Sequence, residues 1–590
     1  MRVSLTKMMN SSVMRRFVLA ALGVLLPGLS AGAASPVFDP DAIFRHISVL
    51  AHDSLEGRRV GDPGARKAAA YIQSQFEQIG LEPGGSENGS GGAFRQEFEF
   101  TAETHAGTMN TLVIGDRKLR FVHKSKSEFQ PLFSSRTGDF SFDSLVYVGY
   151  GIEFDSLDHH DYAGLDVKGQ AVLISRSSPD GDDPHGPYYE HTALGSKIAE
   201  AIKHEVAGIF FFTPDNIPET FEQRWRMNES QRDIPIVFLS RAVFNEELPT
   251  PEKLAGVPFS GTVDLEKVKK TATNIIGGLT GGKEGAAGRI VVVGAHYDHL
   301  GYGGKGSGSL YAGTDPQIHN GADDNASGTA GIIELARYFA GKKDELDYSL
   351  LFIAFTGEEA GLLGSNYFVK NPTVDLDKVS FMINLDMIGR LRPDTKGLGV
   401  FGVGTSPSFK ERYDDYDGKF KINTSESGVG PSDHTAFYNS GAPVLHFFTG
   451  AHSDYHKPTD DIELIDSNGA AQTLAFIAGE IERFAGNKDK LAFSKTKDSS
   501  PGGPRRFSVT LGIMPDYLTE VKGLRIDGVT DDRAANLAGL IAGDVIVKLG
   551  DYAIDDIYGY MSALGKFRKG DSTVVVVLRD GQRMELPIVF

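Results

Sequence analysis

At residues 290–298 the chain reads Ile290-Val291-Val292-Val293-Gly294-Ala295-His296-Tyr297-Asp298. Such a continuous run of apolar and small residues is typical of a strand that is buried on both faces of a sheet. His296 and Asp298 come directly where this predicted strand ends. Because open α/β sheets carry their sites at the carboxyl ends of strands, the stretch indicates both a fold class and the position of a functional site.

Three further apolar runs repeat this arrangement, and acidic or histidine side chains follow each of them. The runs and the residues that follow are Leu350–Phe355 with Glu358 and Glu359, Val379–Leu385 with Asp386, and Val444–Phe448 with His456. Helical patterns over Ala326–Ala340 and Ala470–Phe484 alternate with these runs. The alternation predicts an α/β fold, a mixed sheet that helices cover on both faces.

The side chains at these strand ends form a pattern typical of a metal site. A turn, Gly321-Ala322-Asp323-Asp324-Asn325, adds an acidic pair before a helix. Alone, each motif has an ordinary explanation, since acidic residues before a helix commonly cap it. Together they supply imidazoles and carboxylates without sulfur, the donors that suit catalytic zinc. The candidate donors are His296, the Asp323-Asp324 pair, the Glu358-Glu359 pair, Asp386 and His456. Two metals about 3.5–4 Å apart that share one carboxylate would form a hydrolytic pair.

The same motifs resemble the zinc aminopeptidases of peptidase family M28. The similarity rests, in this order, on His296-Tyr297-Asp298, Gly321–Gly328, Gly357-Glu358-Glu359, Asn384-Leu385-Asp386-Met387 and Tyr455-His456. The resemblance implies a zinc exopeptidase fold of the phosphorylase/hydrolase-like type with two Zn²⁺ per chain. Carried over position by position, it assigns His296 and Asp386 to one zinc and Glu359 and His456 to the other, with Asp323 as the bridge.

The resemblance also implies roles for three further residues. Glu358 would be the general base, which takes a proton from the attacking water and passes it to the leaving amine. Asp298 would orient His296, as metal-bound imidazoles generally require. Tyr455 would stabilise the oxyanion. These roles imply an aminopeptidase that hydrolyses N-terminal residues from peptides.

Other assignments stay open at this point. His299 is an alternative ligand to His296, and Asp433 with His434 forms a candidate wall of the substrate pocket. The same fold serves carboxypeptidases and also glutaminyl cyclases, which work with one zinc. A non-catalytic, peptide-binding adaptor on a peptidase-like scaffold is a further alternative. Cobalt or manganese would suit the same donors.

Composition narrows the classes of partner. The chain has 590 residues, a formal net charge of -18 and no cysteine. Nucleic-acid binding requires a basic surface, so the acidic excess argues against nucleic acid as a partner. The absence of cysteine excludes disulfides, cysteine nucleophiles and thiolate metal sites. Any metal must therefore be held by His, Asp and Glu.

Residues 1–34 are typical of a secretory signal peptide. Arg15 and Arg16 precede the apolar run Phe17–Leu26, and the small residues Ala31–Ala34 follow, which is the order of the charged, apolar and cleavage regions. A membrane anchor is the alternative. However, the run is short for a span, and no later stretch reaches the roughly 18 apolar residues of a membrane helix. We expect a periplasmic or secreted protein with no stable membrane anchor.

The remaining sequence divides into a peptidase domain and two further modules. The predicted segments are the N-terminal part of the peptidase domain at 35–128, a β-rich insertion at 129–265, the zinc peptidase domain at 266–490, a linker at 491–504 and a C-terminal module at 505–590. Val148–Ile152 and Asp166–Gly169 resemble a protease-associated (PA) domain. An unrelated β-rich insertion is the alternative.

Residues 505–590 resemble a PDZ domain. Thr510-Leu511-Gly512-Ile513 is similar to the carboxylate-binding loop of that family, so Leu511, Gly512 and Ile513 are candidates to bind a peptide C-terminus. PDZ domains add such a peptide as a strand at a sheet edge. A structural cap is the alternative function.

Overall fold

The computed structural model describes most of residues 37–590. The ranges outside the description are 1–36, 87–92, 123–126, 182–186, 189–190, 216, 218, 220–230, 248–255, 305–306, 394, 415, 487–489, 497–508, 517–520, 530–532, 555–556 and 569. The predicted signal peptide and residues 497–504 of the predicted linker lie outside the described residues. Among the described helices, none has both the length and the apolar character that a membrane span requires.

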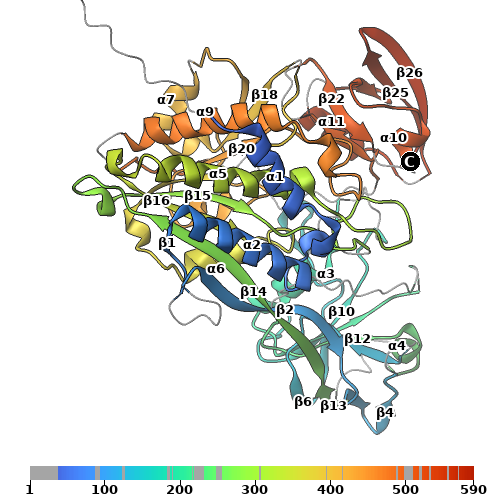
Figure 1. Ribbon diagram of the computed structural model, residues 1–590. Coiled ribbons are helices and arrows are strands. Elements are labelled where there is room, and N and C mark those ends of the chain that lie inside the picture. Colours follow the sequence, from blue (N-terminus) through green and yellow to red (C-terminus); the bar gives the residue numbers. More distant parts are fainter. Residues whose placement is uncertain are drawn as a thin grey trace, which may run out of the picture.

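A nine-stranded mixed sheet lies at the centre of the peptidase domain, in the order β1-β14-β16-β15-β17-β20-β18-β19, with β2 paired to β14 (Figure 1). The strands are β1 (Glu82–Pro83), β2 (Arg95–Ala106), β14 (Leu265–Leu279), β15 (Ile290–His296), β16 (Ser349–Phe355), β17 (Val379–Leu385), β18 (Gly397–Phe401), β19 (Lys421–Ser425) and β20 (Val444–Phe448). β15, β16, β17 and β20 run parallel, whereas β14 and β18 run antiparallel to β16 and β20. The predicted mixed sheet is confirmed.

Helices cover both faces of this sheet. They are α1 (Pro40–Leu50), α2 (Pro63–Ile79), α5 (Gly328–Ala340), α7 (Pro407–Asp414) and α9 (Ser467–Ala485) on one face, and α6 (Leu363–Lys370) and α8 (His434–Asn439) on the other. Val291 and Val293 pack into the core of the first face, and Val292 packs into the core of the second. Alternate side chains of β15 thus enter two apolar cores, which is why the strand is apolar throughout.

Local sequence explains the ends of α1 and α2. Each begins with a proline, Pro40 or Pro63, that follows an aspartate, because a proline at the first helical position loses no hydrogen bond. α2 ends at Gly80, whose φ of 84° is a left-handed conformation that glycine adopts without strain. Both helices therefore lie where the apolar spacing predicts them.

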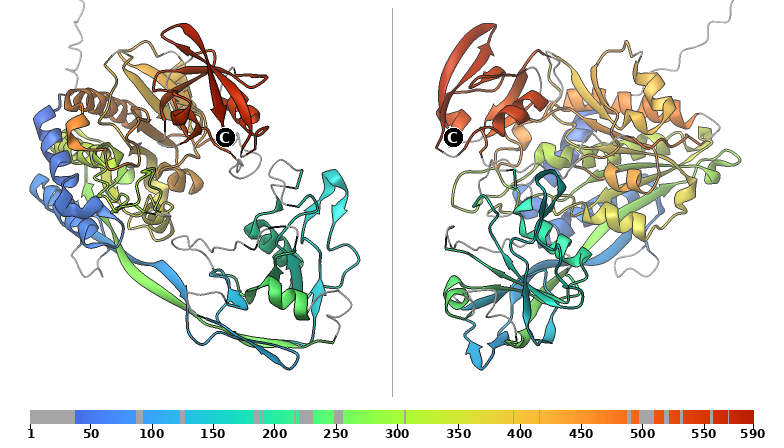
Figure 2. Two further views of the ribbon diagram at one scale, coloured as in Figure 1. Left: turned by 90° about the vertical axis from the view of Figure 1, so that its right-hand side faces the viewer. Right: turned by 180° about the vertical axis from the view of Figure 1, so that it is seen from behind.

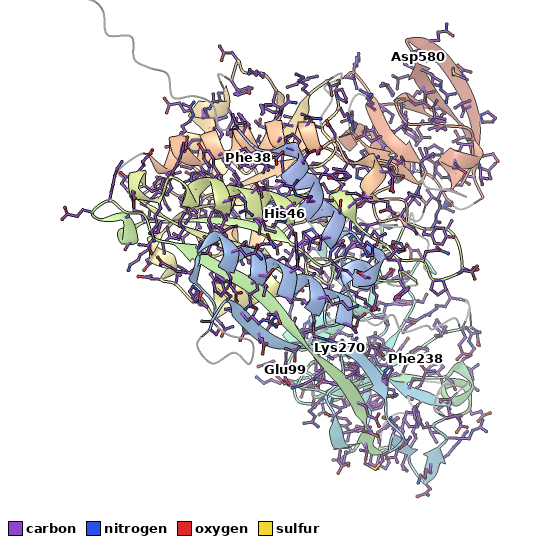
Figure 3. The ribbon with its side chains drawn as sticks, viewed as in Figure 1. Phe38, His46, Glu99, Phe238, Lys270 and Asp580 are labelled. Carbon is purple, nitrogen blue, oxygen red and sulfur yellow. The ribbon has the colours of Figure 1, made fainter. Side chains whose placement is uncertain are left out.

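The two longest strands, β2 and β14, pair antiparallel and extend beyond the sheet as an arm that carries the insertion (Figure 2). Glu99 and Lys270 mark this arm in Figure 3, and Phe238 marks the insertion. The first half of β14 is polar and largely exposed, so it lacks the apolar run by which the other central strands were predicted.

The insertion contains a four-stranded sheet, β4-β3-β13-β6, and a five-stranded sheet, β5-β12-β11-β10-β7. Its elements are β3 (Thr111–Ile114), β4 (Arg117–Leu119), β5 (Phe129–Pro131), β6 (Gly138–Phe142), β7 (Leu145–Tyr147), β8 (Glu153–Phe154), β9 (His159–His160), β10 (Ala171–Ser175), α3 (Leu194–Lys203), β11 (Gly208–Phe212), β12 (Ile236–Leu239), α4 (Arg241–Glu247) and β13 (Phe259–Val263). β3 pairs with β13 and β4. The structure therefore begins the insertion before β3, earlier than the predicted boundary at residue 129.

The C-terminal domain, residues 509–590, has its own sheet and its own apolar core. Its elements are β21 (Ile513–Pro515), β22 (Leu524–Val529), α10 (Ala534–Leu537), β23 (Val545–Leu549), β24 (Tyr552–Ala553), α11 (Ile557–Leu564), β25 (Ser572–Arg579) and β26 (Gln582–Val589). β21 lies at one edge of the sheet, and β25 and β26 form a hairpin whose turn contains Asp580 (Figure 3). Figure 2 shows this domain and the insertion on the same side of the peptidase domain.

Candidate metal centre

Parallel strands bring the predicted site residues to one edge of the central sheet. His296 is the last residue of β15, Asp386 follows β17, and Glu358 and Glu359 follow β16. His456 lies in the segment after β20. Since β15, β16, β17 and β20 run parallel, their carboxyl ends meet at the same edge, as the sequence predicts.

Asp324 lies between the two histidines. Its Oδ1 is 3.5 Å from Nε2 of His296, and its Oδ2 is 3.2 Å from Nε2 of His456. Nε2 of His296 also lies 3.4 Å from Oδ1 of Asp386, and Nε2 of His456 lies 3.2 Å from Oε2 of Glu359. One carboxylate therefore reaches both halves of the cluster.

The side chain of Asp323, the carboxylate that we expected to bridge the metals, points elsewhere in the structure. Its Oδ1 accepts hydrogen bonds from the backbone N–H of Gly389 at 2.7 Å and from Oγ of Ser327 at 3.0 Å. Its Oδ2 lies 3.2 Å from Nε2 of His452. Asp460 holds the turn itself, since its carboxylate accepts the backbone N–H groups of Asp323 and Asp324. Neighbouring acids in one turn thus serve different partners.

His299, the alternative ligand, lies beside the second half of the cluster. Its Nδ1 is 2.8 Å from Oε1 of Glu359, while Nε2 of His456 approaches the other oxygen of the same carboxylate. His299 therefore contacts a candidate ligand, whereas the position between Asp324 and Asp386 belongs to His296.

The electrostatics of the cluster favour a bound cation. Burial raises the pKa of Glu358 well above its ordinary value, and Glu359 and Asp386 add to this effect against the opposing influence of His296. Burial disfavours protonated His456, but Glu359 and Asp324 outweigh it and raise its pKa to about 11. Crowded, buried carboxylates require positive charge nearby. Two imidazoles and several carboxylates without thiolate fit zinc in that role.

Asp298 contacts both Glu358 and His296. It is fully buried, and its Oδ1 accepts the backbone N–H of Glu358 at 3.1 Å. The same oxygen lies 3.8 Å from Nδ1 of His296, which has the backbone carbonyl of Asp298 nearer, at 3.2 Å. Burial raises the pKa of Asp298 to about 7, against the opposing influence of His296. Asp298 therefore lies where an orienting residue is expected, and its backbone makes the closer contact with His296.

A cavity of about 460 Å³ opens above these residues. Tyr455 lines it, and its ring stacks on His456 with 3.8 Å between ring centroids. The predicted wall residues Asp433 and His434 do not line this cavity, because they are buried behind it. Ser432 lies at the surface of the cavity instead, and its Oγ donates to Oδ2 of Asp386 at 2.8 Å.

The buried Arg58, which is not among the predicted site residues, joins the loops that carry the site. Its guanidinium donates to the backbone carbonyls of Tyr297 at 2.7 Å, Asn320 at 2.6 Å and Gly321 at 3.0 Å. A fourth bond, to the carbonyl of Leu50, ties in α1. Burial lowers the pKa of Arg58 to about 10, although the nearby acids oppose this effect. No local pattern marks this role, since three of these four carbonyl partners lie more than 200 residues away.

We predict that Arg58→Met lowers the free energy of unfolding by about 3–5 kcal/mol, because it leaves several buried carbonyl groups without a donor. Urea unfolding followed by circular dichroism measures this effect. Arg66→Met is the matched control, since Arg66 is exposed and its guanidinium donates to the nearby carbonyl of Gly61. Equal unfolding midpoints for the two variants would contradict the structural role of Arg58.

Comparisons with known proteins show what this chain is similar to. Residues 274–481 match the model of peptidase family M28. The chain is 35% identical over 140 residues to leupeptin-inactivating enzyme 1 of Streptomyces exfoliatus, which covers 23% of this chain and 30% of that protein. It is 29% identical over 316 residues to aminopeptidase YwaD of Bacillus subtilis, covering 52% of this chain and 60% of that protein.

Among solved structures, the aminopeptidase from Aneurinibacillus sp. strain AM-1 aligns with a TM-score of 0.42 and 21% sequence identity, over 79% of this chain and 98% of that chain. The similarity to leupeptin-inactivating enzyme 1 and to aminopeptidase YwaD spans less than two thirds of the length of each of these relatives. The family match contains His296, Asp324, Glu358, Asp386 and His456. The N-terminal helices and the C-terminal domain lie outside it.

Proposed function

We propose that this chain, whose residues 274–481 match peptidase family M28, is an exported zinc-dependent aminopeptidase that hydrolyses N-terminal residues from peptides. The observation that carries the proposal is the position of Asp324, whose two oxygens approach His296 and His456 from opposite sides. His296, Asp324 and Asp386 would hold one Zn²⁺, and Asp324, Glu359 and His456 would hold a second. Bound zinc would activate a water and polarise the substrate carbonyl.

The residues around the cavity supply the remaining chemistry. Glu358 lines the cavity, and burial raises its pKa, which makes its carboxylate a ready proton acceptor. It would take the proton of the attacking water and deliver it to the leaving amine. The hydroxyl of Tyr455, on the same cavity wall, would donate a hydrogen bond to the oxyanion. Ser432 would hold Asp386 in place through its hydroxyl.

Aminoacyl fluorogenic substrates, each with a free and an N-blocked terminus, test this proposal. We expect the free substrates alone to be cleaved, a chelator to abolish cleavage, and added zinc to restore it. Metal analysis of the dialysed protein should give about two zinc ions per chain. Cleavage of N-blocked substrates alone would refute aminopeptidase activity, and one zinc with cyclisation of N-terminal glutamine would indicate a glutaminyl cyclase.

We also propose the two flanking modules as a PA-type insertion and a PDZ-type C-terminal domain. The parallel arrangement of β7, β10, β11 and β12 and the edge position of β21 after Leu511 and Gly512 support these proposals. The N–H of Gly512 donates to Oγ1 of Thr510 at 3.0 Å, so a peptide C-terminus bound at this loop would compete with an internal bond. Binding of C-terminal peptides from a broad library to the whole protein tests the PDZ assignment.

A further inference from the structure

The cavity above the metal cluster has walls from two domains. His296, Asp324 and Glu358 contribute its polar surface. Beside them, residues of the C-terminal domain, Ile513 and Pro515, line the same cavity. The C-terminal domain therefore reaches the candidate catalytic residues, although more than 50 residues of chain separate it from His456.

The position of β21 explains why these two side chains face the cavity together. Residues 513 and 515 are the first and last residues of this three-residue strand, and both line the cavity. Among the described strands, β21 pairs with β22 alone, along one of its edges. Both residues are half-buried. They thus form an apolar surface on an edge strand, within reach of a molecule that occupies the cavity.

Arg392 joins the C-terminal domain to the peptidase domain beside this wall. Its Nη1 lies 3.0 Å from Oδ2 of Asp516, and its Nη2 pairs with Oδ2 of Asp527. The same nitrogen, Nη2, donates to the carbonyl of Ala451 at 3.4 Å, and Ala451 itself lines the cavity.

Burial makes this contact specific. The side chains of Asp516 and Asp527 are 0% and 4% exposed, so moving Arg392 away would remove the nearest cation from two buried carboxylates. Nε of Arg525 lies farther from Oδ2 of Asp516, at 3.7 Å. Asp516 directly follows Pro515 in the chain. The ion pairs therefore fix the strand that carries the apolar wall.

The rest of the cavity wall indicates what this surface contacts. Its large apolar residues include Leu310, Met387, Phe401, Phe448, Ile513 and Pro515. Such a lining binds an apolar side chain, and the adjacent metal cluster would place the scissile bond of a peptide at the polar end.

We propose that the C-terminal domain completes the substrate pocket of the aminopeptidase: Ile513 and Pro515 contact the apolar side chain of the substrate's N-terminal residue, and Arg392 holds them there through Asp516 and Asp527. This inference rests on the proposed function. According to this inference, the C-terminal domain helps to determine which N-terminal residue is cleaved. A C-terminal domain that only recruited peptides away from the cavity would not affect that choice.

The ratio of kcat/KM for leucine and alanine 4-nitroanilides tests whether Ile513 contacts the side chain of the substrate. In the zinc-loaded, full-length protein, Ile513→Ala is expected to lower the leucine-to-alanine ratio about tenfold while alanine hydrolysis stays within about twofold. Leu537→Ala, at an exposed apolar residue of the same domain, should leave the ratio unchanged. An unchanged ratio in an active Ile513→Ala variant would overturn this inference alone. If wild-type protein cleaved no aminoacyl substrate, the proposed function itself would fail, and this inference with it.

Docking of the domain has a second test that does not depend on activity. Arg392→Met is expected to increase the radius of gyration measured by small-angle scattering, and Asp516→Asn should do the same to a smaller extent. Arg583→Met, at an exposed residue of β26 that pairs with Glu585, is the matched control. Variants at Arg392 and Asp516 that stay as compact as wild type and keep its leucine-to-alanine ratio would refute the role of Arg392.

Discussion

A Glu358→Gln variant is expected to retain its zinc and to lose about 10³-fold in kcat. The side chain lines the cavity, and its nearest imidazole contact, from Oε2 to Nε2 of His296, is 3.9 Å. It is therefore free to accept a proton, and its raised pKa matches that task. Glutamine keeps the size of the side chain but cannot carry the proton.

Glu359→Gln is the matched control for this prediction. Glu359 lies 3.2 Å from His456 and 2.8 Å from His299, so its replacement should reduce the zinc content as well as the rate. Zinc analysis by mass spectrometry and steady-state kinetics separate the two outcomes. Full activity in Glu358→Gln, or loss of zinc from it, would contradict the assignment of Glu358 as the base.

An Asp324→Asn variant is expected to lose at least part of its bound zinc and on the order of 10²–10³-fold in kcat/KM. Among the described residues, Asp324 is the only carboxylate that lies within 4 Å of both Nε2 of His296, through Oδ1, and Nε2 of His456, through Oδ2. An amide presents one oxygen and no charge, so a shared ligand would be lost.

Asp323→Asn tests the same turn at the neighbouring position. Its amide oxygen can still accept from the N–H of Gly389 and the hydroxyl of Ser327, so we expect both zinc ions to remain and activity to fall by less than about tenfold. Equilibrium dialysis followed by metal analysis of the two variants gives the comparison. If Asp323→Asn lost zinc and Asp324→Asn kept it, Asp323 would be the bridging residue, as the resemblance to family M28 implies.

The sequence pattern predicted the central sheet because a strand that is buried on both faces appears in the sequence as a continuous apolar run. The runs at 379–385 and 444–448 coincide with β17 and β20. Side chains of both strands pack into the apolar cores on the two faces of the sheet. The same rule missed β14, since the half of that strand in the arm is exposed and polar. The predicted start of the insertion, residue 129, lies after β3 and β4. β3 pairs with β13, which is far along the chain, so no local pattern assigns these short strands to the insertion.

The sequence by itself determined which residue types end the parallel strands, and so placed His296, Glu358, Glu359, Asp386 and His456 together at one edge of a sheet. Only the tertiary structure decided that Asp324 rather than Asp323 faces the histidines, that Arg58 ties the site loops together, and that Ile513 reaches the cavity. The physical reason is that strand periodicity is a local property, whereas the direction of a side chain in a turn depends on partners such as Gly389 and Asp460 from distant parts of the chain.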